Sequence, residues 1–221
     1  MKTFNHVKLP QLDFDLKAET TDSGRLYATP TGEKYKSITT VLGNHNKQAI
    51  MEWRERVGAE EATKISTKAA NRGTKVHKIC EDYINNQTNE FRLQTLMPDL
   101  KEMFFKIKPI IDEKLGDVYA QEQALYSHKL KIAGRVDLIG MWDGKLSVID
   151  FKTSAKQKEE SYIQNYFMQC TAYALMFSEL TGIWIDDIVV LIATGEGEAQ
   201  LFERQIHDYQ KPLMQYIDKY A

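Results

Sequence analysis

The first half of the chain is predicted to be mainly helical from the residue types it contains. Strong helix formers dominate residues 47–85, and this stretch is predicted to form two or three helices, broken at Gly58 and Gly73. A further helix is predicted over residues 97–114. Ahead of them, residues 25–37 place a Pro-Thr-Gly turn between two short β-prone runs, so we expect a small hairpin there.

The period changes from helical to alternating after Gly116. Residues 118–127 and 130–141 alternate as strands do, and residues 142–145 (Trp-Asp-Gly-Lys) predict a hairpin turn. Residues 146–151 form an apolar run that is typical of a buried strand. These three strands are expected to form a meander.

The last quarter of the chain alternates between helix and strand. Residues 161–181 predict a helix that ends at Gly182, followed by strands over residues 184–193 and 199–206. A terminal helix is predicted over residues 208–220, beginning at its aspartate. This order of elements predicts an α/β or α+β fold in which helices flank a mixed central sheet.

The composition is that of a globular protein, with 43% hydrophobic and 27% charged residues. No repeat or Pro/Gly/Ser-rich linker divides the sequence, so we expect a single domain over residues 1–221. Residues 1–115 would form its hairpin and N-terminal helical region, and residues 116–221 its sheet core. The formal charge of -2 provides no global positive field, so any site for a polyanion must be local.

The two cysteines, Cys80 and Cys170, are too few for a disulfide framework or for the usual four ligands of an iron–sulfur cluster. We expect two buried thiols. The first 22 residues contain four acidic residues and no apolar core of a signal peptide, and the sequence has no long apolar run. The sequence therefore predicts a cytoplasmic protein without a signal peptide, transit peptide or membrane span.

Three charged residues lie in or beside predicted buried strands. Asp137 interrupts an apolar strand, and Asp150 and Lys152 share one face of the next strand because alternate side chains point the same way. The hairpin turn brings the two aspartates to one end of the sheet, where a hard cation such as Mg²⁺ or Mn²⁺ would relieve their repulsion. The alternative is an Asp150–Lys152 ion pair on a solvated strand end, with Asp137 an edge residue.

The stretch from Gly134 to Ser154, GRVDLIGMWDGKLSVIDFKTS, resembles the signature of the PD-(D/E)XK nuclease superfamily in its RecB-like exonuclease branch. The resemblance implies a metal site formed by Asp137, Asp150 and the carbonyl of Phe151, with Lys152 as a catalytic residue. Four further matches are His77 in a Gly-x-x-x-His setting, Gln169 and Tyr173 in Gln-x-x-x-Tyr, and Glu122 on the first strand. They imply His77 and Glu122 as metal ligands, and Gln169 and Tyr173 as catalytic residues.

Each of these further residues also has a plain structural interpretation. His77 would pair with Glu81 on a helix face, Gln169 and Tyr173 would be a pair at the edge of the core, and Glu122 would lie on a solvated strand edge.

The N-terminal half, from YATPTGEKYKSITTVLG to AANRGTKVHKICEDYI, is similar to mitochondrial genome maintenance exonucleases and their bacteriophage relatives. The resemblance implies an exonuclease dependent on Mg²⁺ or Mn²⁺ that acts on DNA, in particular on single-stranded ends or flaps, in replication, recombination or repair. It implies no iron–sulfur cluster, since the cysteines are missing. The alternatives are a double-strand exonuclease or structure-specific endonuclease with the same site, and a non-catalytic DNA-binding accessory module.

Basic residues gather in the helical region, where residues 47–78 hold eight basic and four acidic side chains. Spacings of four, four and three place Lys64, Lys68, Arg72 and Lys75 along one helix face. We expect this stripe to guide DNA into the metal site, and Thr153 and Ser154 to bind a phosphate. The alternative is an ordinary solvated helix face.

Overall fold

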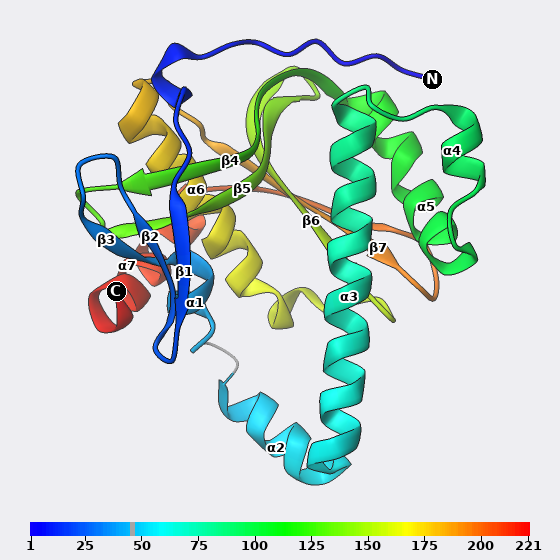
Figure 1. Ribbon diagram of the computed structural model, residues 1–221, viewed down its shortest axis with the longest axis horizontal. Helices are drawn as coiled ribbons and strands as arrows, with labels where there is room; N and C mark the ends of the chain where they lie inside the picture. Colours follow the sequence, from blue (N-terminus) through cyan, green and yellow to red (C-terminus); the bar gives the residue numbers. More distant parts are fainter. Residues whose placement is uncertain (45–46) are drawn as a thin grey trace.

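A mixed sheet of eight strands forms the centre of the computed structural model, which describes residues 1–44 and 47–221 (Figure 1). The strands run in the order β1-β2-β3-β5-β6-β7-β8, and β4 pairs with β5. The β3–β5 and β6–β7 pairs are parallel. Helices cover both faces, so the predicted α/β fold with a mixed sheet is confirmed.

The elements follow the predicted order. The strands are β1 (Lys17–Thr21), β2 (Gly24–Ala28), β3 (Lys34–Ser37), β4 (Leu115–Ser127), β5 (Ile132–Trp142), β6 (Lys145–Ser154), β7 (Asp187–Thr194) and β8 (Gln200–Gln205). The helices are α1 (Ile38–Leu42), α2 (Lys47–Val57), α3 (Ala59–Ile84), α4 (Glu90–Gln94), α5 (Pro98–Lys114), α6 (Gln164–Thr181) and α7 (His207–Tyr220). The sequence predicted none of β1, α1 and α4. Helix α7 begins one residue before Asp208, whose carboxylate lies in its first turn.

The predicted break at Gly73 is wrong, because Gly73 lies inside α3, a continuous helix of 26 residues. A glycine inside a helix costs about 1 kcal/mol relative to alanine, which is less than the packing of one buried turn contributes. On the turns after Gly73, Val76 and Cys80 are 0% and 1% exposed. The predicted break at Gly58 is confirmed, since α2 ends and α3 begins there, and Gly58 has a φ of 93°.

Two hydrophobic cores lie on opposite faces of the sheet. One fills the space between the sheet and α1, α6 and α7, and the other the space between the sheet and α3 and α5. Both cysteines are buried as expected, Cys80 in the second core and Cys170 in the first. No helix among the described residues is both long enough and apolar enough to cross a membrane.

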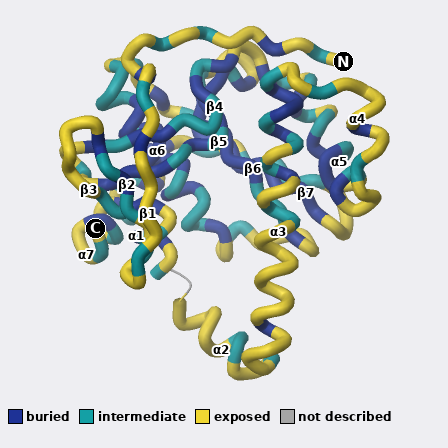
Figure 2. Tube along the Cα trace, in the orientation of Figure 1, coloured by how far each residue is buried: buried dark blue, intermediate teal, exposed yellow. Residues whose placement is uncertain are grey.

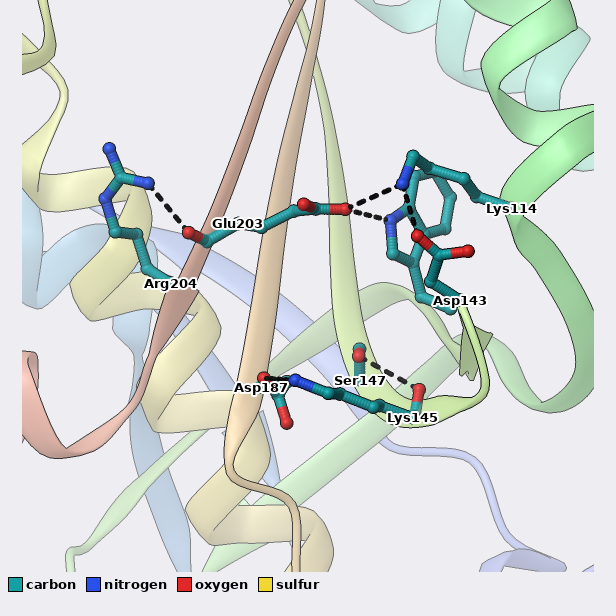
Figure 3. A network of polar contacts seen from close by, with 8 residues as sticks. Lys114, Asp143, Lys145, Ser147, Asp187, Glu203 and Arg204 are labelled. Carbon is teal, nitrogen blue, oxygen red and sulfur yellow. Dashed lines mark hydrogen bonds and ion pairs between the residues drawn. The ribbon is translucent and has the colours of Figure 1, made fainter.

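The β5–β6 hairpin is closed by the predicted Asp-Gly turn. Asp143 and Gly144 have φ angles of 51° and 80°, as both central residues of a type I′ turn require. The ammonium of Lys114 lies 2.5 Å from a carboxylate oxygen of Asp143 and 3.3 Å from one of Glu203, which also accepts a bond from the adjacent Trp142 indole (Figure 3). These contacts fix the closed end of the hairpin to α5 and β8.

The same two strands separate at their other end. Pairing between β5 and β6 runs from Trp142 opposite Lys145 only as far as Leu138 opposite Ile149. Beyond this point β6 continues beside β7 to Ser154, whereas β5 pairs with β3 near Ile132. A fork therefore opens between β5 and β6, and Asp137 stands at its base.

Candidate functional site

Three potential ligands converge beside the fork from three different elements. His77 on α3, Glu122 on β4 and Asp137 on β5 each offer a ligand atom, and these atoms all lie within 4.8 Å of one another. We call these three residues the metal cluster. The pairing of β4 with β5 places Glu122 opposite Asp137, and His77 Nδ1 lies 3.4 Å from Asp137 Oδ2.

Asp137 bridges the base of the fork. Its Oδ2 accepts a hydrogen bond of 2.9 Å from the backbone N–H of Phe151, a donor that the separated strands leave without a ladder partner. Burial alone would raise the pKa of Asp137, but the hydrogen bond and charge of His77, together with Lys152, hold it below the usual value. Asp137 therefore stays ionised and ready to bind a cation.

Glu122 has an unusual backbone for a residue inside a strand. Its φ is 47°, in the left-handed region, and the Arg135 guanidinium donates to its carbonyl oxygen. Burial and the negative charge of Asp137 raise the pKa of Glu122 to about 7. A cation between the two carboxylates would remove this repulsion, so the cluster has the electrostatics of a metal site.

Asp150 lies outside the metal cluster, in a buried ion pair with Lys152. Lys152 Nζ is 2.5 Å from Asp150 Oδ2, and the two side chains are 19% and 1% exposed. Burial raises the pKa of Asp150 to about 6 despite the nearby lysine, whereas the carboxylates raise the pKa of Lys152 against the effect of its burial. The ion pair weighed in the sequence analysis is therefore present, but it is buried and not on a solvated strand end.

Gln169 and Tyr173 on α6 extend this pair into a network. The Gln169 amide donates to Asp150 Oδ1 at 3.3 Å and to the Tyr173 hydroxyl at 3.4 Å, and its oxygen accepts from Lys152 Nζ at 3.4 Å. Tyr173 lies so close to β5 that a Cβ at Gly134 would come within 2.9 Å of its ring. Gly134 therefore permits the contact between α6 and the fork.

The two predicted phosphate ligands follow Lys152 at the end of β6. Ser154 is 7% exposed, at the end of β6 where it pairs with Thr194. Thr153 faces α3, since its hydroxyl lies 3.5 Å from the place of a Cβ on Gly73. Neither residue lines the cavity at the metal cluster.

The metal cluster opens into a cavity of about 550 Å³ whose rim carries three cationic residues, Arg25, Lys78 and Arg135. Lys78 is paired with Glu81 and Asp82, and Arg135 with Asp15. Arg25 on β2 has no ion pair with any described residue and lies over the Tyr27 ring. No local pattern in the sequence singles out Arg25, because only the tertiary fold brings β2 to this cavity.

The basic stripe lines a different cavity. Lys64, Lys68, Arg72 and Lys75 border a space of about 700 Å³ between α3 and α5. Nine residues, about two and a half helical turns, separate Lys68 from His77, so the stripe and the cluster lie on opposite faces of α3. The sequence predicted that this stripe leads into the metal site, but in the fold the stripe lines a cavity that shares no residue with the cavity of the metal cluster.

The donor set of the cluster fits a divalent cation. Carboxylate oxygens suit Mg²⁺ and Mn²⁺, and an imidazole nitrogen is more favourable for Mn²⁺ than for Mg²⁺. The three donors leave one side open to the cavity, as a catalytic metal requires for its substrate.

Comparison with known proteins gives one family. Residues 48–183, more than half of the chain, match the family model of the PD-(D/E)XK nuclease superfamily. Two solved structures are partly similar: a candidate exonuclease from Eubacterium rectale (10% identity, 68% of this chain and 69% of that chain, TM-score 0.40) and SSO0001 (14%, 83% and 85%, 0.38). No curated protein matches the sequence. The family match spans the metal cluster and the ion-pair network.

Proposed function

The chain belongs to the PD-(D/E)XK nuclease superfamily, and we propose that it is a Mg²⁺- or Mn²⁺-dependent exonuclease that hydrolyses phosphodiester bonds in DNA. The observation that carries this proposal is the convergence of His77, Glu122 and Asp137 at an open cavity. These residues would hold the cation, with Asp150 and the Phe151 carbonyl as further candidate ligands at the fork. A bound cation would polarise the scissile phosphate and lower the pKa of a bound water.

Lys152 would orient the attacking water and stabilise the charge that develops on the phosphate. Its ammonium is protonated at neutral pH, because Asp150 and Asp137 lie close to it. The Gln169 amide, held between Asp150 and the Tyr173 hydroxyl, would fix the lysine in this position. A preorganised charge of this kind contributes most where water is excluded, and Lys152 is largely buried.

Arg25 would bind a phosphate of the substrate. Its side chain borders the cavity of the metal cluster and has no carboxylate partner among the described residues. Arginine offers a planar set of donors that matches phosphate oxygens, so a free guanidinium at this rim is suited to the strand that enters the cavity.

The choice of DNA, of single-stranded ends or flaps, and of a role in replication, recombination or repair rests on the sequence resemblance to RecB-like exonucleases. The same site would also serve a double-strand exonuclease or a structure-specific endonuclease. A non-catalytic DNA-binding module is disfavoured by the presence of all three ligands together with the Asp150–Lys152 pair.

The test is digestion of single- and double-stranded DNA labelled at either end, with Mg²⁺, Mn²⁺ or EDTA. We expect mononucleotides or short products from single-stranded ends with either metal and none with EDTA. Asp137→Asn keeps an oxygen that can accept from Phe151 N–H but removes a ligand charge, so it should fold and should not cleave. Metal-independent cleavage, or full activity of Asp137→Asn, would contradict the proposal.

A further inference from the structure

The cavity between α3 and α5 has one cationic wall and one apolar wall. Its cationic wall is the basic stripe on α3, and its apolar wall includes Met97, Leu100 and Met103 at the start of α5. It shares no lining residue with the cavity of the metal cluster. The two cavities therefore lie on either side of one helix.

The charges of the cationic wall are largely unpaired. Lys68, Arg72 and Lys75 form no ion pair with any described residue, and Arg72 Nε is buried without a hydrogen-bond acceptor there. On the opposite wall, Glu102 lies 2.9 Å from Lys106, whose ammonium also donates to the carbonyls of Thr194 and Gly195. The Glu102 charge is thus neutralised within α5, and the one other carboxylate among the described residues that line the cavity, Asp99, is outnumbered by the cations of the stripe, so the cavity carries a net positive charge that favours anions.

The size and the apolar wall of the cavity indicate a polymer. From Lys64 to Lys75 the cations extend over eleven residues, about 16 Å of helix, which is too long for one phosphate group. Met97 is 62% exposed and lies over the buried Leu100 and Met103, so its side chain offers an apolar surface against which a base can pack. Regularly spaced phosphates with apolar faces between them are the chemistry of a single nucleic-acid strand.

We propose that the cavity between α3 and α5 is a second binding site for single-stranded nucleic acid, separated from the cleavage site by α3. The proposal rests on the proposed nuclease function, because it assigns this site to a part of the substrate strand away from the bond that is cleaved. The stripe would hold the phosphates of this part, while Arg25 and the metal cluster would hold the cleaved end.

The test compares Lys68→Gln/Arg72→Gln/Lys75→Gln with the control Lys8→Gln/Lys129→Gln/Lys211→Gln. The control removes the same charge from exposed lysines that line neither cavity. Binding of fluorescent oligothymidylate and oligouridylate is measured in EDTA over a range of salt concentrations. Each lost phosphate contact lowers the magnitude of the slope of log K against log[salt] by about 0.7. The slope of the stripe variant should therefore be smaller than that of the wild type by about 2, and the slope of the control variant should change much less.

Cleavage separates this proposal from the proposed function. With Mn²⁺, the stripe variant should show a lower kcat/KM on a long oligonucleotide but wild-type cleavage of a dinucleotide, which is too short to reach the second site. A slope and a long-strand kcat/KM equal to those of the control would overturn the second site. If the wild-type protein cleaves neither substrate, but the stripe variant binds oligonucleotides with a smaller salt dependence than the wild type, the second site is supported and the proposed nuclease function is contradicted.

Discussion

The two halves of α3 have very different surroundings. In the C-terminal half, Val76, Cys80 and Tyr83 are at most 1% exposed, and they pack between the sheet and α5. In the N-terminal half, Ala62 is the one buried residue among the described residues 59–72, and none in α2 is buried (Figure 2). The tube in Figure 2 changes from blue and teal to yellow along the helix as it leaves the sheet.

This difference gives the two halves of α3 different roles: the packed half positions a metal ligand, and the exposed half offers side chains that can bind a substrate strand. His77 lies in the packed half, so its ring is held against β4 and β5 by neighbours that cannot shift without opening the core. Most of the basic stripe lies in the exposed half, where side chains are free to contact a ligand. One continuous helix thus provides a fixed ligand for the cleavage site and a solvent-accessible surface for the strand.

The largest effect should follow from a cavity in the packed half. Tyr83→Ala removes a fully buried ring that makes edge contacts with Phe4 and Phe104, and we expect it to lower the free energy of unfolding by about 3–5 kcal/mol. Ile65→Ala in the exposed half should change it by less than about 0.5 kcal/mol. Urea denaturation measures the free energy of unfolding of both variants. Equal losses would show that the exposed half is as tightly coupled to the fold as the packed half.

A loss of stability of the same order is expected for the ion pair at the fork. Lys152→Ala leaves the Asp150 carboxylate buried without its partner, which should cost about 3–5 kcal/mol of stability and also abolish cleavage. The double variant Asp150→Leu/Lys152→Met removes both charges, so it should recover most of the stability and none of the cleavage. If the double variant is no more stable than Lys152→Ala, the loss comes from packing and not from an unpaired charge.

The smallest effect should occur where the two halves of α3 meet, and it should be a gain. A Cβ at Gly73 would lie 3.5 Å from the Thr153 hydroxyl, an ordinary contact, and alanine favours the helix more than glycine does. Gly73→Ala should therefore raise the free energy of unfolding by about 0.5–1 kcal/mol. Thermal denaturation of the variant beside the wild type checks this. A lower stability would mean that the packing of α3 on β6 requires a glycine.

The sequence predicted the sheet core well because its signals are local. Alternation marked the strand before the Asp-Gly turn and an apolar run marked the strand after it, and a charged residue within an apolar strand was enough to single out Asp137. The same signals could not show whether Glu122 is a metal ligand or a solvated residue. Its neighbours Gln121 and Gln123 are also polar, so polar side chains occur on both faces of this strand. Its approach to His77 depends on the local backbone of β4, which no pattern in the sequence reveals.

The errors in the helical region have a different cause. The break at Gly73 was inferred from intrinsic propensity, which tertiary packing of the next turn outweighs. The position of the basic stripe relative to His77 could have been predicted from the sequence, because the spacing from Lys68 to His77 places these residues on opposite sides of a continuous helix. The positions of Arg25 and of the α5 wall at the two cavities could be found only from the fold, since β2 and α5 are far from the other lining residues in the sequence.

The central claim is that His77, Glu122 and Asp137 bind a divalent cation, and calorimetric titration with Mn²⁺ tests it most directly without DNA or turnover. We expect saturable binding to the wild-type protein and to Asp22→Asn, which removes an exposed carboxylate away from the cluster. Asp137→Asn should bind Mn²⁺ at least tenfold more weakly. Wild-type affinity in Asp137→Asn, with the variant folded, would contradict the account.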